Sequence, residues 1–577
     1  MTSHYIDFDL PRVALCFNGE RPEEHAGKRS ISARETVCLE SQTSRYKCLA
    51  QFICLQAART ALNNPVLWED YPDLDVFRVG DVFYYSSSTF AFSPGAPVLK
   101  SYDLSNWAPV THSVPTLSFG SRYNLNSATD RAYVKGIWAS TLQYRKSNDV
   151  FYWMGCVQDT GQTHVWTSAN SGAGANNGEV TNWNWTSRGT ISRCYYDCGL
   201  LIDEDDTMYV AYGNPKISVA QLSTDGMKEV RNQQVFATSD NTVIEGSRMY
   251  KVKGNYYIFV TRPANAEFVL KSKSPWGPYE MRTLLDGISG PLSNAGVAHQ
   301  GGIVDTKDGT YYYVAFLDAY PGGRIPVAAP LTWTSDGWPQ LVKDNNAWGK
   351  SYPAAVQTSK TVPFVTGTDT FQGSSLSPEW EWNHNPDNSK WKLVGGSGGL
   401  NLQAATVTND LFTARNTLTH RIIGPKSHGT FRLDISGMRD GDRAGAVLFR
   451  DVAAYIGIHK EGNNAKLVFV NNLSLDQSNG WATKSTGSVA ASGPSIASSE
   501  IWLRAQADIT PAFGTNTQRQ ATFWYSTDGS NFSQLGGGFG MVNSWQFFTG
   551  YRYGVFNFAT RGLGGQVTVK SFDMQLI

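Results

Sequence analysis

From about residue 63 onward, hydrophobic and polar residues alternate in short runs of period two, and no helical period persists beyond two turns. Five stretches share one plan: a residue suited to a site, an apolar run, a tight polar turn and, 11 to 14 positions after the first residue, a tyrosine. Each stretch predicts a β-hairpin whose first strand begins at the site-type residue. The five pairs of ends are Asp73 and Tyr84, Trp138 and Tyr152, Asp197 and Tyr209, Glu245 and Tyr257, and His299 and Tyr312.

Repeats of strands at a spacing of roughly 50 residues indicate a β-propeller, here with five blades over residues 63–350. The innermost strands of all blades meet around one axis in such a fold. Residues more than 200 positions apart in the chain can therefore face each other across one pocket.

The alternation changes character after residues 351–370, a stretch rich in Pro, Thr and Ser that predicts a linker or an irregular crossing strand. Residues 371–577 hold at least eight short period-two runs bounded by turn residues, and these predict an antiparallel, jelly-roll-like β-sandwich. The expected fold class is all-β, a propeller followed by a sandwich. The runs are 429–435, 444–450, 454–460, 465–471, 501–507, 520–526, 553–559 and 566–572.

Composition narrows the classes of function. The 49 basic and 49 acidic side chains balance, so nothing indicates a nucleic-acid partner or a cationic one. The chain contains no run of 18 or more apolar residues, so the sequence predicts no membrane-spanning helix. The 18 Trp, 27 Tyr and 28 Phe fit many short strands and also surfaces that stack on sugars, although an aromatic strand residue is more often plain core.

Residues 1–60 differ from the rest. A polar segment without period precedes Arg45 and Lys47, an apolar run at 48–57 and small residues, which together have the parts of a secretory signal placed about 45 residues too far into the chain. One hypothesis is that the natural leader starts here and the mature, secreted protein begins near Leu62. A disordered extension is the alternative, and the sequence leaves both open.

Four of the seven cysteines lie in this leader region. The body holds Cys156, Cys194 and Cys198, too few for a disulfide scaffold. On one straight strand Cys194 and Cys198 would be roughly 13 Å apart, so at most one of them pairs with Cys156, and buried thiols are the alternative.

Three acids occupy the site-type position of the repeats: Asp73, Asp197 and Glu245. Two carboxyl groups across a pocket can cleave a glycosidic bond if one is protonated and the other is ionised. A third acid helps, because its negative charge keeps the proton on the general acid. Any one of them alone is more simply a strand-start acid bonded to backbone, but three in register with one repeat weaken that explanation.

The motifs resemble glycoside hydrolase family 43. Residues 71–107 have the family's Pro-Asp pair, Arg-x-Gly-Asp, Pro-Gly-x-Pro and Ser-x-Asp-Leu-x-Asn-Trp, and the later motifs follow in the family's order. The tail segments 379–391 and 441–451 are similar to its accessory sandwich, so the resemblance covers 63–577. The later propeller motifs are IWASTLQY (137–144), YYDCGLLIDEDDTMYVAYG (195–213), IEGSRMYKVKGNYYIF (244–259), HQGGIVDTKDGTYYYV (299–314) and GGRIPVAAPLTW (322–333).

The resemblance implies roles for the three acids. Asp73 is expected to be the general base, Glu245 the general acid, and Asp197 the acid that tunes and orients Glu245. The family inverts anomeric configuration, which requires carboxyl groups roughly 6.5–9.5 Å apart with a water between base and sugar.

The resemblance also implies substrate contacts. Trp138 is expected to form an apolar wall and Phe90 to contact substrate. Arg324 is expected to reach sugar hydroxyls, or else to form a surface ion pair. His299 is expected to face a water-coordinated cation on the propeller axis, or else to be a satisfied strand histidine. No cofactor is required by this reasoning, and a Ca²⁺ or Na⁺ on the axis would be structural.

One departure concerns the base. Many family members have Pro-Asp-Pro-Ser where this chain has Pro72-Asp73-Leu74-Asp75, so Asp75 lies on the same face of a strand as Asp73 and is a rival. Asp73 is preferred because it matches the motif and lies at the mouth of the strand. Asp75 is expected to be a deeper hydrogen-bond partner.

The Asp-Leu-Asp segment, the lead-in at 64–70 and the appended sandwich resemble fungal α-L-arabinofuranosidases that act on arabinoxylan, some of which release 3-linked arabinose from doubly substituted xylose. The expected activity is therefore secreted, extracellular removal of arabinofuranosyl side chains from this plant cell-wall polysaccharide. An exo-β-xylosidase is the alternative enzyme. A non-catalytic carbohydrate-binding protein is disfavoured by three mutually repelling acids, and a metal-dependent hydrolase by the lack of clustered His or Cys ligands.

Overall fold

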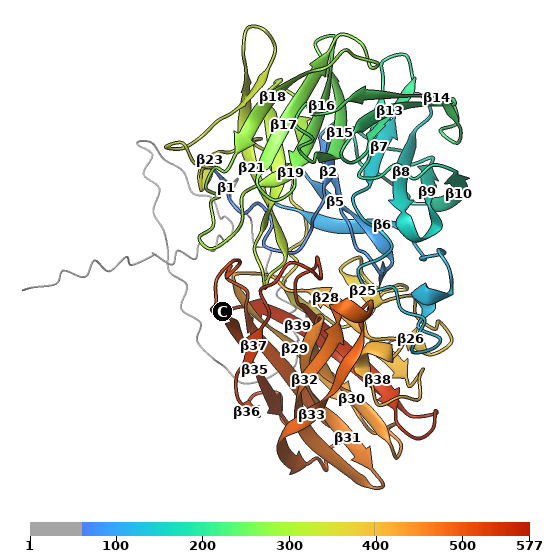
Figure 1. Cartoon of the computed structure of the whole chain (residues 1–577). Helices are drawn as coiled ribbons and strands as arrows, with labels where there is room; N and C mark the ends of the chain where they lie inside the picture. The colour runs from blue at the N-terminus through green and yellow to red at the C-terminus, as the bar shows by residue number, and fades with distance from the viewer. Residues whose placement is uncertain (1–60, 397) are drawn as a thin grey trace, which may run out of the picture. The chain divides into compact units, whose positions relative to one another are not determined.

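The computed structural model describes residues 61–396 and 398–577, and nearly all regular structure in them is β. Five four-stranded antiparallel sheets follow one another in the chain and form the blades of a propeller, and two larger sheets form a sandwich after them (Figure 1). The leader, including the possible signal and four of the cysteines, lies outside the described residues. Across the described residues, no helix is long and apolar enough to cross a membrane.

Each blade uses consecutive strands, apart from the first, where the short strand β4 lies outside the blade. Blade 1 contains β2 (Asp75–Val79), β3 (Val82–Ser86), β5 (Gly95–Ser101) and β6 (Ala108–Val114). Blade 2 contains β7 (Thr141–Arg145), β8 (Val150–Val157), β9 (Gln162–Ala169) and β10 (Trp185–Ile191). Blade 3 contains β11 (Gly199–Ile202), β12 (Met208–Tyr212), β13 (Ile217–Leu222) and β14 (Glu229–Phe236). Blade 4 contains β15 (Glu245–Val252), β16 (Asn255–Arg262), β17 (Ala266–Ser272) and β18 (Glu280–Asp286). Blade 5 contains β19 (His299–Asp305), β20 (Tyr311–Asp318), β21 (Arg324–Trp333) and β22 (Pro339–Leu341).

The five predicted hairpins are confirmed as the first two strands of the five blades. Glu245 and His299 are the first residues of β15 and β19, whereas Asp73, Trp138 and Asp197 lie two or three residues before β2, β7 and β11. The alternation predicts the strands because one face of each packs on a neighbouring blade, with Val76, Val210 and Ile258 fully buried.

Polar contacts between blades 1 and 5 close the ring. Arg78 in β2 donates to the backbone oxygen of Asp305 and forms an ion pair with its carboxylate, with Nη2 2.6 Å from Oδ2. Asn64 adds a two-way link, because its amide donates to the oxygen of Ala328 and accepts from the nitrogen of the same residue. Strand β1 (Ala61–Asn63) also pairs with β23 (Ser351–Pro353), so the segments before and after the blades hold each other.

The sandwich consists of two antiparallel sheets around a core of aromatic and aliphatic side chains that includes Trp380, Phe431 and Phe572. All eight predicted runs are strands of these sheets. One sheet contains β24 (Gly367–Asp369), β26 (Trp391–Leu393), β27 (Leu400–Gln403), β29 (Lys426–Asp434), β34 (Glu500–Asp508), β35 (Arg519–Ser526), β36 (Ser533–Gln534), β37 (Phe539–Met541) and β39 (Gln566–Leu576). The other contains β4 (Phe92–Ser93), β25 (Trp380–Asn383), β28 (Leu418–Arg421), β30 (Asp442–Phe449), β31 (Val452–Glu461), β32 (Asn464–Asp476), β33 (Ala482–Ser495) and β38 (Arg552–Ala559).

Strand β4 joins the two halves of the chain. It belongs by sequence to the first blade, yet it pairs with β25 of the sandwich, with Ser93 opposite Trp382 and Phe92 opposite Asn383. This pairing adds a short edge strand to the sandwich sheet from the propeller. The pairing therefore fixes the position of the segment around β4 relative to β25 of the sandwich.

Short elements complete the described structure. Four 3₁₀ helices, each of three or four residues, are its only helices: η1 (Ser121–Asn124), η2 (Gln158–Thr160), η3 (Leu411–Thr413) and η4 (Gln477–Asn479). A disulfide joins Cys156 in β8 to Cys194, which precedes β11, so it ties blade 2 to the entry of blade 3. The third cysteine of the body, Cys198, is a buried thiol.

Candidate active site

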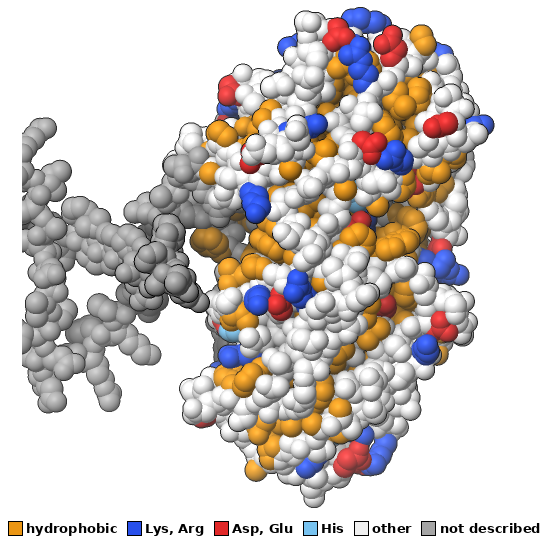
Figure 2. All heavy atoms as spheres, turned by 60° about the vertical axis from the view of Figure 1, so that its left-hand side comes forward, with side chains coloured by type: hydrophobic (Ala, Val, Ile, Leu, Met, Phe, Trp, Pro, Cys, Tyr) orange, Lys and Arg blue, Asp and Glu red, His pale blue; other side chains and the backbone are white. Residues whose placement is uncertain are grey.

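A pocket of about 450 Å³ opens at the end of the propeller where the inner strands begin. Figure 2 shows acidic and histidine side chains in a hollow beside hydrophobic ones, while basic and acidic side chains are scattered over the rest of that face. All seven site residues predicted from the sequence line this one pocket. They are Asp73, Phe90, Trp138, Asp197, Glu245, His299 and Arg324.

Asp73 is almost completely buried and has a donor on each carboxylate oxygen. Ser88 donates to Oδ2 at 2.7 Å, and Nη1 of Arg324 donates to Oδ1 at 2.6 Å. A guanidinium and a hydroxyl on one carboxylate stabilise its anion and fix its direction.

Asp197 and Glu245 come from blades 3 and 4 and interact with each other. Burial raises the pKa of Asp197 well above its ordinary value, and the neighbouring carboxylates of Glu245 and Asp73 raise it further. Burial also raises the pKa of Glu245, while Asn214 opposes the shift. Because the two groups titrate together, the retained proton belongs to the pair.

Two neighbours fix the position of the Glu245 carboxylate. The exposed Asn214, in the turn between β12 and β13, donates a hydrogen bond from Nδ2 to Oε2 of Glu245. The hydroxyl of Tyr196 lies 3.5 Å from the same oxygen. Glu245 is only partly buried and lines the pocket, so its carboxyl group is open to a ligand.

A buried arginine holds the backbone from which two of the acids project. Arg248 in β15 donates to the backbone oxygens of Asp73 at 2.9 Å, Leu74 at 2.7 Å and Cys198 at 2.7 Å. Its guanidinium thus ties blades 1, 3 and 4 together at the centre of the ring. Its positive charge also lowers the pKa of Asp197, against the larger effect of burial.

Backbone strain gathers around the pocket. Asp73, Asp197 and Gln300 have φ values of 55°, 50° and 50°, in the left-handed region that residues other than glycine seldom adopt. Phe90 and Phe548, on the aromatic wall, share this conformation at 54° and 62°. Such residues cost of order 1–3 kcal/mol each and persist where the surroundings fix them, as at ligand sites.

Aromatic rings from both halves of the chain form one wall. The ring of Phe90 stacks on Phe548 of the sandwich, with centroids 5.6 Å apart and planes within 17°. Trp138 lies 5.5 Å from Phe548 and 6.1 Å from Phe90. Trp545, which is 47% exposed, packs against Phe548 at the rim.

Arg324 connects the acids with the sandwich. Besides binding Asp73, it donates from Nε to the backbone oxygen of Phe548 at 3.1 Å. The buried carboxylate of Asp70 accepts from the backbone nitrogens of Arg324 at 2.7 Å and of Gly550 at 2.9 Å. Asp70 therefore holds the start of β21 and the sandwich loop in a common position.

His299 lies in the pocket with its ring oriented by the backbone. Its Nδ1 is 2.8 Å from the oxygen of Val297, which leaves Nε2 towards Asp318 Oδ2 at 3.9 Å. Among the described residues, no group of three or more His, Cys, Asp or Glu side chains could hold a metal ion. His299 and Asp318 thus belong to no set of direct metal ligands among the described residues. A water-coordinated cation beside His299 stays a prediction.

Asp75 is placed below the pocket rather than in it. Its carboxylate accepts from the hydroxyl of Thr141 at 2.6 Å and from the nitrogen of Leu142 at 3.0 Å. It is 1% exposed and does not line the pocket. This geometry agrees with the expectation of a structural hydrogen-bond partner that joins β2 to β7.

Several residues that line the pocket or support its acids escaped the sequence analysis. Tyr196 directly precedes Asp197 in the YYDCG segment, and that position was the available signal. Asn214 lies in a polar turn, and Arg248 lies inside a strand, so neither stands out. No pattern in the sequence indicates that Phe513, Trp545 and Phe548, from loops of the sandwich, reach a pocket in the propeller.

Comparison with known proteins decides the family. Residues 62–339 match the model of glycosyl hydrolases family 43, and residues 368–575 match the β-xylosidase C-terminal concanavalin A-like domain. A solved structure, from work that engineered the active site of a GH43 glycoside hydrolase, is 63% identical and covers 90% of this chain and 100% of its own, with a TM-score of 0.88. The chain belongs to glycoside hydrolase family 43. It is a glycosidase with a catalytic propeller and a concanavalin A-like sandwich.

Curated relatives of this family 43 enzyme have two kinds of name. A β-xylosidase from Formosa agariphila is 28% identical over 88% of this chain and 89% of its own length. A non-reducing end α-L-arabinofuranosidase, BoGH43B from Bacteroides ovatus, is 28% identical over 61% of this chain and 67% of its own. The relatives thus leave the choice of sugar open.

Proposed function

We propose that this enzyme is an inverting hydrolase that removes α-L-arabinofuranosyl side chains from arabinoxylan or its oligosaccharides. The observation that carries the proposal is the convergence of Asp73, Asp197 and Glu245, from three blades, in one aromatic-walled pocket of about 450 Å³. A pocket of this size with convergent polar groups suits one sugar residue and its linkage.

In the proposed mechanism Glu245 donates a proton to the leaving oxygen, and Asp73 takes a proton from the attacking water. The raised pKa of Glu245, caused first by burial, supports a proton on this residue in the resting enzyme. Arg324 and Ser88 support an ionised Asp73. Asp197 would orient Glu245 and share with it the proton that the pair retains, and the negative charge of Asp73 disfavours loss of that proton. No step requires a metal or cofactor.

The remaining pocket residues would bind and orient the sugar. Trp138 and Phe90 supply apolar ring faces, on which the C–H faces of a sugar can pack. Nη2 of Arg324 is buried and has no hydrogen-bond partner among the described residues, so a sugar hydroxyl in the pocket would find a donor nearby. His299 and Asp318 offer further polar atoms at the floor.

The choice of arabinofuranose rests on the relatives. The 63% identical structure comes from work on an engineered enzyme that displays both endo-xylanase and exo-arabinofuranosidase activity. The β-xylosidase name of the Formosa protein supports exo-β-xylosidase as the second candidate. A disulfide between Cys156 and Cys194 supports secretion, because such bonds persist in oxidising surroundings.

The test compares nitrophenyl α-L-arabinofuranoside, nitrophenyl β-xyloside and arabinoxylan as substrates, with NMR of the first-formed anomer. We expect arabinose from the polymer with inverted configuration. Glu245→Ala should fold normally and lose about 10²–10⁴-fold in turnover of arabinoxylan, since general acid catalysis is commonly worth that factor. Release of xylose alone would favour the second candidate, and retained configuration would contradict the assigned roles.

A further inference from the structure

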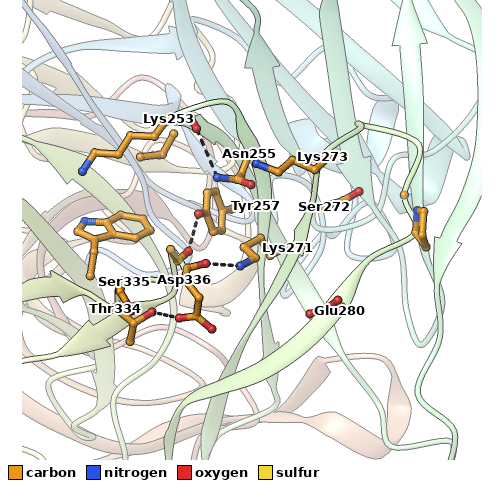
Figure 3. A pocket seen from close by; sticks show the side chains of 15 residues that line it. Lys253, Asn255, Tyr257, Lys271, Ser272, Lys273, Glu280, Thr334, Ser335 and Asp336 are labelled. Carbon is orange, nitrogen blue, oxygen red and sulfur yellow. Dashed lines mark hydrogen bonds between the residues drawn. The ribbon is translucent and has the colours of Figure 1, made fainter.

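A second and larger cavity, of about 710 Å³, lies at the end of blade 4 that is remote from the active site. Figure 3 shows the side chains that line it. The cavity is built from the turns between β15 and β16, between β17 and β18, and between β21 and β22. Strand β15 starts in the active site at Glu245 and ends at Val252 on the cavity, so eight residues of extended chain, about 23 Å, separate the two. We call this cavity the blade 4–5 groove.

Cationic side chains predominate in the blade 4–5 groove. Lys253 and Lys273 are exposed, and neither has an ion-pair or hydrogen-bond partner for its ammonium group among the described residues. Lys271 is engaged, because its Nζ donates to the backbone oxygen of Asp336 at 2.6 Å and lies over the ring of Trp338.

The two acids of the groove do not neutralise these lysines. Asp336 pairs with Arg282 at 2.8 Å and accepts from the hydroxyl of Thr334. Glu280 is exposed at the rim, and no ion pair involves it within the described residues. Lys253 and Lys273 together therefore leave one positive charge in excess over Glu280, which favours an anionic ligand.

The groove also carries features suited to a sugar ring. Trp333 packs edge-on against Tyr257, with centroids 5.5 Å apart, and both line the groove. Tyr257 is held by its hydroxyl, which donates to the oxygen of Gly337 at 2.6 Å. Asn255 and Ser335 add side-chain amide and hydroxyl groups. Figure 3 shows Asn255, Tyr257 and Lys273 in the upper middle of the groove, with Asp336 below them and Lys253 extending to the left.

We infer that the blade 4–5 groove binds a carboxylate-bearing sugar unit of an acidic polysaccharide chain. The charge of Lys253 and Lys273 would attract the carboxylate, and the half-buried Trp333, against which the buried Tyr257 packs, would contact the pyranose face. A small free anion would use the lysines but not Trp333 or most of the volume. The groove would then anchor the enzyme to uronate-substituted regions while the active-site pocket acts on side chains.

The test measures binding of the full chain in native gels that contain a xylan with glucuronic acid side groups, or the same xylan after reduction of its carboxyl groups. Glu245→Gln serves as the common background so that the polymer stays intact. We expect retardation by the acidic xylan that weakens with salt, and much less retardation by the reduced one. Sodium glucuronate is added as a competitor to distinguish binding of a free uronate from binding of a uronate carried on the polymer. We expect it to reduce the retardation only at high concentration.

Variants assign the binding to the groove. Lys253 has a φ of 48°, where asparagine is well tolerated, so Lys253→Asn with Lys273→Gln removes two charges with little risk to the fold. This double variant should bind the acidic xylan roughly three- to tenfold more weakly, because each exposed charge contributes modestly. Trp333→Ala should also weaken binding, and Glu280→Gln should strengthen it.

The matched control is Lys146→Gln with Lys484→Gln, which removes two exposed lysines elsewhere and should leave binding unchanged. All lysine variants, made in the active enzyme, should hydrolyse nitrophenyl arabinofuranoside as the parent does. Equal retardation by acidic and reduced xylan, or unchanged binding by the Lys253/Lys273 double variant, would overturn the inference. The inference does not depend on the proposed side-chain activity, since hydrolysis and binding are measured separately.

Discussion

Burial raises the pKa of the shifted active-site carboxyl groups, and single polar contacts adjust it. Burial raises the pKa of both Asp197 and Glu245, and hydrogen-bond donors oppose that shift only at Glu245. The exposed Asn214 is the strongest of those donors. Substitution of Asn214 should therefore change the pH dependence of activity while every active-site carboxyl group is retained.

Replacing Asn214 with alanine should move the alkaline limb of the pH profile of kcat/KM to higher pH. The amide of Asn214 lowers the pKa of Glu245, so its removal raises that pKa and keeps the general acid protonated to higher pH. Activity at the optimum should fall about fivefold, the worth of one hydrogen bond of about 1 kcal/mol. Asn214→Asp should shift the limb in the same direction. A limb that stays in place or moves to lower pH would separate Asn214 from the proton of Glu245.

Asp70 is a second residue with influence beyond its own position. Asp70→Asn keeps the shape of the side chain but leaves one carbonyl oxygen to accept from the nitrogens of Arg324 and Gly550. One buried N–H then lacks a partner, which should cost about 1–3 kcal/mol of stability. Because Arg324 and Phe548 depend on this link, we expect kcat/KM to fall at least about tenfold.

Thermal unfolding measures the expected loss of stability of Asp70→Asn. Kinetics at a temperature well below the unfolding transition measure the loss of kcat/KM in the folded enzyme. Asp508→Asn, at a partly exposed carboxylate bonded to Lys426, serves as the control and should leave turnover unchanged. Normal kcat/KM in folded Asp70→Asn enzyme would show that the pocket does not rely on this carboxylate.

The sequence indicated those site residues that lie in a repeat and could not indicate those brought in by tertiary contacts. Asp73, Asp197 and Glu245 occupy the same place in successive hairpins, so their convergence follows from closure of the ring. Phe548 reaches the pocket from a loop about 475 residues after Asp73, and no local periodicity records such a contact. Functional roles of all these residues stay predictions.

At the scale of elements, the sequence pattern predicted strands that have one or both faces buried, such as β38, and missed strands that are mostly exposed or very short. Strand β33 carries small and polar residues on both faces, since it lies at an edge of the sandwich and is mostly exposed. Strand β4 has two residues and pairs with a sheet of the other half of the chain. Its partner β25 pairs with it across 289 and 291 residues of sequence, so neighbouring residues contain no sign of the pairing.

The link between blades 2 and 3 should be the most sensitive to reduction. Cys156 and Cys194 are separated by 38 residues, and closing a loop of that length in the unfolded chain is worth about 4 kcal/mol in the chain-entropy model. Cys156→Ser with Cys194→Ser should therefore lower the free energy of unfolding by about that amount.

Denaturant unfolding with and without a reducing agent measures the effect. Reduction should destabilise the parent and leave the double variant unchanged. Cys198→Ser provides the control, because Cys198 is a buried free thiol that donates to the oxygen of Met154 and should respond to reduction as the parent does. Equal sensitivity of the double variant would show that another group is reduced.

At the scale of the whole molecule, a buried charge cluster holds propeller and sandwich together. Glu381 in the sandwich accepts from Arg421 at 2.8 Å and from Arg552 at 2.6 Å, and lies 3.1 Å from Nε2 of His112 in the propeller. Arg421 also donates to the backbone oxygen of Asp70 at 2.8 Å, which connects the cluster to the active-site wall. The pocket and the interface are thus parts of one polar network.

Neutralising Glu381 should loosen this interface. Burial alone would raise the pKa of Glu381, but Arg421 and Arg552 hold it below its ordinary value of 4.5. Its contribution to stability is therefore complete above that value and is lost as pH falls through the lowered folded-state pKa. Glu381→Gln should cost about 3–5 kcal/mol at neutral pH, because it leaves buried guanidinium groups without an anion. The difference in stability from the parent should shrink in acid.

Glu500→Gln, which breaks a more exposed pair with Arg432, is the control and should cost less than about 1 kcal/mol. Equal losses for the two variants in denaturant unfolding would remove the cluster as the link between the halves.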